Sequence, residues 1–180
     1  MSRSGDQAQF PSSAAAQTRL PTDRGRRLQI GVLGASVCDQ DTARLAYEVG
    51  AEIARRGAVL LCGGLGGVME AASRGAREQG GLTVGILPGE SAADANPFVD
   101  VTIVTDMGHA RNVILVRSCH AVIAVSGGYG TLSEIAIARK TGIPCIGLRS
   151  WDLKGEIPSA RSATEAVEWA LQQARQRGGP

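Results

Sequence analysis

The chain has 180 residues and a mass of 18.6 kDa, the size of one domain that can bury a core without disulfide bonds or metal ions. Aromatic residues make up only 3% of it, which argues against a stacking platform for single-stranded nucleic acid. Residues 1–27 hold five of the 19 basic residues and two of the 17 acidic ones, so the remainder carries 14 basic and 15 acidic side chains. Because the chain after residue 27 is so close to neutral, it lacks the basic surface expected of a protein that binds duplex DNA or anionic membranes. We expect neither nucleic acid nor membrane as a partner.

The amino-terminal segment, residues 1–27, is rich in Ser, Ala, Gln, Pro and Arg without hydrophobic periodicity, which predicts a disordered basic tail. This segment lacks the apolar core of a secretory signal, and no apolar run in the chain approaches the roughly 20 residues of a spanning helix. The four cysteines are far apart and form no C-x-x-C pair or Cys/His cluster. We therefore expect reduced thiols, no metal site and a cytoplasmic location.

From Leu28 onward, short apolar runs alternate with segments of helical periodicity. Strands are expected at 28–34, 58–62, 82–87, 99–105, 121–126 and 143–148. Helices are expected at 41–56, 68–78, 109–118, 131–141 and 162–176. The strand at 99–105 alternates in polarity, which indicates a place near the edge of a sheet. The pattern predicts the α/β class: one domain over residues 28–180 with a single doubly wound, Rossmann-like parallel sheet and helices on both faces.

Two glycine-rich turns, GGLGG at 63–67 and SGGYG at 126–130, each end an expected strand and open an expected helix. Ligands of such sheets bind outside the carboxyl ends of the strands, where helix N-termini offer N–H donors and partial positive charge. Either turn alone is equally well explained as a tight connection, but the two together favour a phosphate site. We predict ligand contacts from Gly34, Ser36, Gly63, Gly64, Gly66, Gly67, Ser126, Gly127, Gly128, Tyr129, Gly130 and Thr131.

Neither turn has the spacing of the dinucleotide fingerprint, and the chain has no G-K-[ST] sequence of a P-loop. A phosphorylated mononucleotide is therefore a better candidate ligand than NAD or ATP with magnesium, and we expect no resident cofactor.

Two charged residues near these turns are candidates for chemistry. Thr131-Leu132-Ser133-Glu134 has the pattern of a capping box, in which Glu134 folds back onto the helix start. Alternatively, this carboxylate orients a water molecule or stabilises a positively charged sugar. Arg111 is either a surface residue or a clamp on phosphate or on a leaving base. We interpret the two lone histidines, His109 and His120, as structural.

Four segments together resemble the LOG-like superfamily: GGLGGVMEAASRGAREQGG (63–81), ILPG (86–89), MGHARNVILVRS (107–118) and SGGYGTLSE (126–134). The resemblance covers about residues 28–150. Its best-known members are cytokinin-activating phosphoribohydrolases, whose signature P-G-G-x-G-T-x-x-E follows an arginine–lysine pair on the preceding helix. The resemblance implies catalytic roles for Arg111 and Glu134 in cleaving a nucleoside 5′-monophosphate to free base and ribose 5-phosphate. It also implies ligand contacts from Met107 and Asn112, and a homodimer or homotetramer.

Two positions depart from that signature: Ser126 stands for the proline and Asn112 for the lysine. The A-R-N form and the short chain look closer to a second branch, which includes molybdenum cofactor carrier proteins that bind a phosphorylated pterin. Two functions therefore stay open for the same small phosphorylated ligand. One is hydrolysis of the N-glycosidic bond, and the other is a carrier or sensor that breaks no bond.

Overall fold

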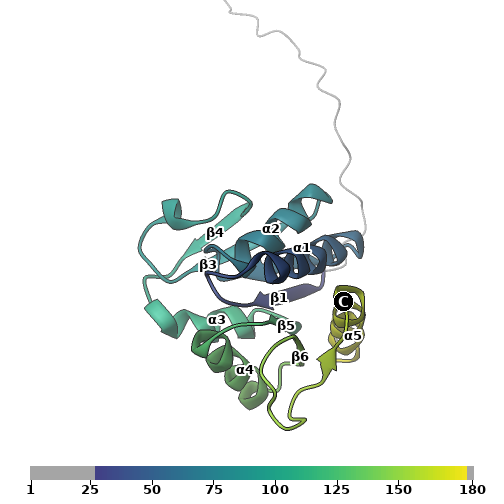
Figure 1. Ribbon diagram of the computed structural model, residues 1–180. Coiled ribbons are helices and arrows are strands. Elements are labelled where there is room, and N and C mark those ends of the chain that lie inside the picture. Colours follow the sequence, from purple (N-terminus) through teal and green to yellow (C-terminus); the bar gives the residue numbers. More distant parts are fainter. Residues whose placement is uncertain (1–26, 178–180) are drawn as a thin grey trace, which may run out of the picture.

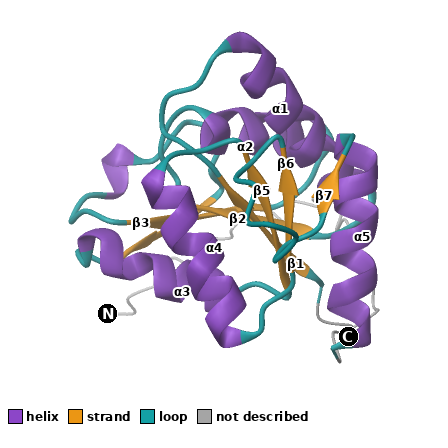
Figure 2. Ribbon diagram, turned by 60° about the horizontal axis from the view of Figure 1, so that its bottom comes forward, coloured by secondary structure: helices purple, strands orange, loops and turns teal. Residues whose placement is uncertain are grey.

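A seven-stranded, fully parallel sheet runs through the computed structural model, which describes residues 27–177 (Figures 1 and 2). The strands are β1 (Gln29–Leu33), β2 (Val59–Cys62), β3 (Thr83–Leu87), β4 (Val101–Val104), β5 (Ala121–Val125), β6 (Cys145–Leu148) and β7 (Ser159–Ala160). The helices are α1 (Gln40–Arg55), α2 (Val68–Glu78), α3 (Arg111–Arg117), α4 (Tyr129–Thr141) and α5 (Ala163–Gln176). Two short 3₁₀ turns, η1 (Ala92–Asp94) and η2 (Gly108–Ala110), precede β4 and α3. The predicted α/β class and doubly wound architecture are confirmed.

Helices cover both faces of the sheet. α1, α2 and α5 pack on one face, where Val49 of α1 shares a buried cluster with Ile30 and Val32 of β1. α3 and α4 pack on the other face, where Leu115 of α3 shares a second cluster with Leu33 of β1. Because β1 is buried on both sides from Ile30 to Leu33, its sequence there is continuously apolar rather than alternating.

The strand order β4-β3-β2-β1-β5-β6-β7 places β1 between β2 and β5. From β1 the chain proceeds outward to β4 and then crosses back to β5 on the other side of β1. At such a reversal the loops that leave the two central strands diverge to opposite faces, and a crevice opens outside the carboxyl ends. The loops after Leu33 and Val125 therefore mark where a ligand can bind.

Helices α1 and α2 touch through two glycines, one on each helix. A Cβ atom on Gly50 would overlap the carbonyl oxygen of Ala72, and one on Gly75 would overlap the carbonyl oxygen of Tyr47. This backbone contact fixes α2 against α1 and thereby holds the loops that lead into both helices at the edge of the sheet.

Several element boundaries differ from those expected. α4 begins at Tyr129 instead of residue 131, because Gly128 is the N-cap in an extended conformation. The helix expected at 109–118 is divided into η2 and α3, and β7 was not expected because two residues give no pattern. β4 does lie at an edge of the sheet, as predicted.

The predicted tail lies outside the described residues, apart from Arg27. Within residues 27–177, no helix combines the length and the apolar character that crossing a membrane requires.

We expect Gly50→Ala to lower the free energy of unfolding by about 2 to 3 kcal/mol, because its Cβ must displace the backbone of α2. The better helix propensity of alanine recovers less than about 1 kcal/mol of this loss. A control is Gly80→Ala, where a Cβ meets nothing within 4 Å and only the positive φ of 72° opposes alanine. That control should cost about 1 kcal/mol. Urea unfolding measures both variants, and an equal loss in the two would contradict the close contact.

Candidate functional site

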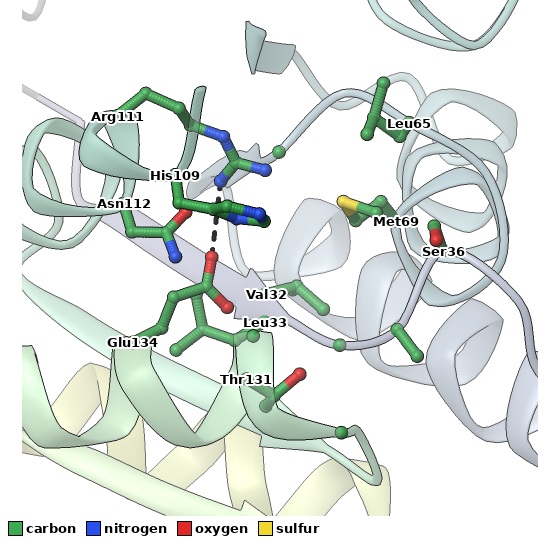
Figure 3. A pocket seen from close by; sticks show the side chains of 15 residues that line it. Val32, Leu33, Ser36, Leu65, Met69, His109, Arg111, Asn112, Thr131 and Glu134 are labelled. Atoms are coloured by element: carbon green, nitrogen blue, oxygen red, sulfur yellow. Dashed lines mark hydrogen bonds and ion pairs between the residues drawn. The ribbon is translucent and has the colours of Figure 1, made fainter. Parts of the chain in front are cut away.

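A cavity of about 270 Å³ lies at the carboxyl ends of β1 and β5, in the crevice that the strand order creates (Figure 3). Its walls come from the loops after β1 and β2, from η2 and the start of α3, and from the first turns of α4. Nine of the residues predicted for the site line it: Gly34, Ser36, Gly63, Arg111, Asn112, Gly128, Gly130, Thr131 and Glu134. Segments far apart in the sequence are thus brought together around one cavity.

A buried ion pair crosses one wall of this cavity. Arg111 begins α3 and Glu134 lies in the second turn of α4, and the Nη1 atom of Arg111 donates to Oε1 of Glu134 at 3.2 Å (Figure 3). The two side chains are only 9% and 8% exposed. The Nε atom of Arg111 is also buried and has no hydrogen-bond partner among the described residues. The pair therefore leaves a buried donor of the guanidinium free for a further acceptor.

Burial raises the pKa of the Glu134 carboxyl from 4.5 to about 7, although the neighbouring Arg111 acts to lower it. Desolvation penalises the charged carboxylate, and one arginine offsets this penalty only in part. Near neutral pH, Glu134 is therefore divided between its protonated and ionised forms. A carboxyl in this state can take up or release a proton at little cost, which is the property of a general acid or base.

Gly63 provides the space that the Arg111 guanidinium occupies. A Cβ atom at this position would overlap Nη2 of Arg111 and would lie 2.7 Å from Sδ of Met69. The first glycine of the GGLGG turn therefore admits the arginine to the cavity wall, in addition to forming the turn itself.

The start of α4 presents free N–H donors to the cavity. Ser126 and Gly127 have φ angles of 51° and 109° and bend the chain, and Gly128 then caps the helix. The first N–H of the helix that bonds to a carbonyl is that of Leu132, which donates to Gly128. The N–H groups of 129–131 donate to no carbonyl in residues 27–177. A Cβ atom on Gly128 or Gly130 would meet nothing within 4 Å, so no other group of the described residues covers these two glycines. Free donors at a helix start favour an anion.

The GGLGG turn at the start of α2 is closed by the loop after β1. The N–H of Val68 donates to the carbonyl of Ala35 at 3.0 Å, and a Cβ on Gly67 would crowd the backbone of Ala35 and Ser36. Gly64, with a φ of 76°, packs against Leu87. The glycines at 64, 66 and 67 thus make close backbone packing possible, and they lie outside the cavity.

Four further residues predicted to contact the ligand also lie outside the cavity wall. Met107 lies 48% exposed in the loop before η2, while Ser126 and Gly127 form the bend behind the start of α4. Tyr129 is 83% exposed, and its ring lies 5.8 Å, centroid to centroid, from that of Trp151. Ser126, Gly127 and Tyr129 thus belong to the turn at the start of α4, and none of the four residues lines the cavity.

The capping-box interpretation of Glu134 is wrong. Thr131 is the third residue of α4 rather than its cap, so Glu134 lies one turn too far along the helix to fold back onto its start. It reaches across to α3 and pairs with Arg111 instead.

The structural interpretation of His109 also needs correction. This residue lies in η2, exposed, and its imidazole projects into the cavity beside Arg111 (Figure 3). Its position two residues before Arg111 was the signal that could have identified it. His120 does have a structural role, because its Nδ1 accepts the N–H of Gln29 at 3.0 Å. The sequence also gave no signal for Val32, Leu33, Ala35, Leu65 and Met69, which supply the apolar part of the wall.

The cavity contains no cluster suited to a metal ion: among residues 27–177, no three His, Cys, Asp or Glu side chains gather as they would around one.

The fold and this cavity define an α/β protein with a Rossmann-like sheet and a cavity where the strand order reverses. Residues 27–176 match the SLOG cluster4 family, and the chain belongs to this family. The predicted membership of the LOG-like superfamily is thereby confirmed.

Three known proteins show how far the similarity extends. An uncharacterized protein of Archaeoglobus fulgidus is 60% identical over 115 residues, which cover 64% of this chain and 76% of that protein. The cytokinin riboside 5′-monophosphate phosphoribohydrolase of Mycobacterium tuberculosis is 41% identical over 107 residues. That match covers 56% of each chain, so this chain spans little more than half of that enzyme. The molybdenum cofactor binding protein of Rippkaea orientalis has a TM-score of 0.78 and 40% identity, covering 82% of this chain and 97% of its own.

The raised pKa of Glu134 predicts a pH dependence of stability. Because the pKa of this carboxyl rises from 4.5 to about 7 on folding, the folded protein keeps a proton that the unfolded chain loses between these pH values. The contribution of Glu134 to stability is therefore complete below about pH 4.5 and is lost as the pH rises through about 7.

Glu134→Gln cannot titrate and provides the reference. We expect the free energy of unfolding of the unaltered protein, minus that of this variant, to fall by on the order of 3 kcal/mol between pH 4.5 and pH 7.5. Urea unfolding at a series of pH values measures this difference. A constant difference over the range would contradict the raised pKa.

Proposed function

We propose that this protein binds a small phosphorylated ligand of the nucleotide type, with its phosphate at the start of α4. The observation that carries this proposal is that the free N–H donors of Gly130 and Thr131 and the buried guanidinium of Arg111 border the same cavity. Both features favour an anion. The names of two similar proteins support a phosphorylated ligand as well. One is a phosphoribohydrolase of a riboside 5′-monophosphate, and the other binds molybdenum cofactor.

We further propose that the bound ligand is a nucleoside 5′-monophosphate and that its N-glycosidic bond is hydrolysed. In this reaction the bond between C1′ and the base nitrogen breaks, water adds hydroxyl to C1′, and the base nitrogen gains a proton. The ionised carboxylate of Glu134 would stabilise the positive charge that develops on the ribose, and Arg111 would assist the departing base. The buried pair supports this reaction, since these two residues match the catalytic arginine and glutamate of the phosphoribohydrolase signature.

A carrier function is the second candidate. Its support is Asn112 in place of the lysine of that signature, together with the similarity to a molybdenum cofactor binding protein over 97% of that protein's length. In this case the same cavity holds a phosphorylated pterin, and Glu134 breaks no bond.

We also propose a cytoplasmic location. Cys62, Cys119 and Cys145 are buried as free thiols, and burial raises the pKa of Cys145 to about 12. Thiols that stay protonated are unreactive, which suits a reducing compartment.

A second copy of this chain is the proposed partner, in a dimer or tetramer. Ile103 of β4 pairs in register with Ile86, which belongs to the core on the α3 side of the sheet, so Val101 and Ile103 face that side as well. These two residues are 44% and 43% exposed, and Val113 of α3, on the same side, is 44% exposed. A second protomer would remove this apolar surface from water.

Base release distinguishes the two functions. We expect the unaltered protein to release free base from one member of a panel of nucleoside 5′-monophosphates. Chromatography of the reaction mixture measures the released base. Glu134→Gln should lower the rate by about 100-fold or more, because it removes the charge that stabilises the ribosyl cation. Glu168→Gln, at an exposed site on α5, is the matched control and should leave the rate unchanged. No release from any nucleotide, with a phosphorylated pterin still raising the melting temperature, would establish the carrier.

A charged substitution tests the proposed interface between two copies of the chain. Ile103→Glu places a charge in the proposed apolar contact, and we expect it to convert the oligomer to a monomer in light scattering after gel filtration. Val37→Glu alters an apolar residue that is 84% exposed elsewhere on the surface and should leave the oligomer intact. A monomeric unaltered protein, or an oligomer in both variants, would contradict this interface.

A further inference from the structure

Asn112 is the second residue of α3, next to Arg111, and it lines the cavity although it is only 4% exposed. An amide side chain carries one acceptor and two donors, so its orientation decides what it offers to a ligand. The hydrogen bonds around this residue fix that orientation.

The Nδ2 atom of Asn112 donates to Oγ of Ser133 at 3.1 Å. Ser133 in turn donates to the carbonyl of Gly130 at 2.7 Å. A serine hydroxyl has one hydrogen, and a carbonyl can only accept, so Ser133 must accept from Asn112. Asn112 therefore turns its NH₂ group toward α4, and its oxygen cannot take that place.

The remaining oxygen, Oδ1, has no hydrogen-bond partner in residues 27–177. Figure 3 shows it turned toward the side of the cavity that Arg111 and His109 form. Leaving such an acceptor unpaired on ligand binding costs about 1 to 3 kcal/mol, so a ligand that fills the cavity is favoured if it brings a donor here.

We propose that Oδ1 of Asn112 accepts a hydrogen bond from an exocyclic amino group on the heterocycle of the ligand. The site thereby selects phosphorylated ligands that carry such a group. The proposal rests on the proposed function, since it places that ligand in the same cavity. It also gives the departure from the phosphoribohydrolase signature a physical meaning. A lysine at this position offers only donors, whereas Asn112, whose NH₂ group is held toward Ser133, also offers an acceptor.

The test compares two nucleotides that differ only in the amino group: AMP, and purine riboside 5′-monophosphate, in which hydrogen replaces it. Calorimetric titration of the full chain should show AMP binding about tenfold more tightly. Asn112→Leu should bring the two dissociation constants to within about twofold by weakening AMP alone. Circular dichroism and the melting temperature verify that this variant folds.

Ser133→Ala tests the orientation without touching the cavity wall. With its partner removed, the amide is free to turn, and the preference for AMP should fall from about tenfold to about threefold. Ser118→Ala is the matched control, because Ser118, the C-cap of α3, makes the same kind of bond to the carbonyl of Ile114 at 2.7 Å and has no hydrogen bond to an asparagine among the described residues. It should keep the full preference.

A phosphorylated 6-hydroxymethylpterin, which also carries an exocyclic amino group, is the second ligand. The tighter binder of AMP and this pterin identifies the heterocycle of the ligand. Asn112→Leu should weaken the binding of that ligand about tenfold. If the unaltered protein binds both nucleotides equally, the assignment of Asn112 is overturned while the proposed function stands. If it binds neither the nucleotides nor the pterin, both fall.

Discussion

The site depends on the buried pair of Arg111 and Glu134, which joins two helices that start at the same edge of the sheet. Taking two charges out of water costs several kcal/mol each, and one hydrogen bond of 3.2 Å does not offset this cost fully, as the raised pKa of Glu134 shows. Apolar side chains of similar volume would pack at this position at lower cost. The surrounding fold retains the pair at the expense of stability, which is the pattern expected of groups that act on a ligand.

Glycines with similar sequence surroundings have different physical tasks in the two turns. At the start of α2, Gly63 leaves room for the Arg111 guanidinium, and Gly67 lets the helix approach the backbone after β1. At the start of α4, Gly128 and Gly130 have empty space in front of them. The first turn therefore builds the wall of the cavity, and the second leaves helix donors open to a ligand. Only the neighbours of each glycine, which belong to distant segments, distinguish these tasks.

A feature can be predicted from the sequence when the interactions that form it are local, and not when they join segments that are far apart in the chain. The sheet and its helices follow from local patterns, as in the continuously apolar β1 and the alternating β4 at the edge. The pairing of Glu134 does not follow from a local pattern. Because α4 starts at Tyr129 and not at residue 131, Glu134 lies too far from the helix start to cap it, and it pairs with Arg111 instead. His109 was missed for a related reason. It has no carboxylate at a suggestive spacing, and its place in the cavity depends on how η2 lies relative to wall segments that are far away in the sequence.

Under the proposed function, binding and hydrolysis would place opposite demands on Glu134. A bound phosphate monoester carries between one and two negative charges near neutral pH, and a like charge nearby favours the protonated carboxyl. The positive charge that develops on a ribose during cleavage favours the ionised form instead. With a pKa of about 7, Glu134 can exist in either form at small cost. One cavity can therefore hold a phosphorylated ligand with Glu134 neutral and still supply a carboxylate when a glycosidic bond begins to break. In the proposed hydrolysis, whether the bond breaks would then depend on how the heterocycle is held on the side of the cavity formed by Arg111, where Asn112 presents its oxygen.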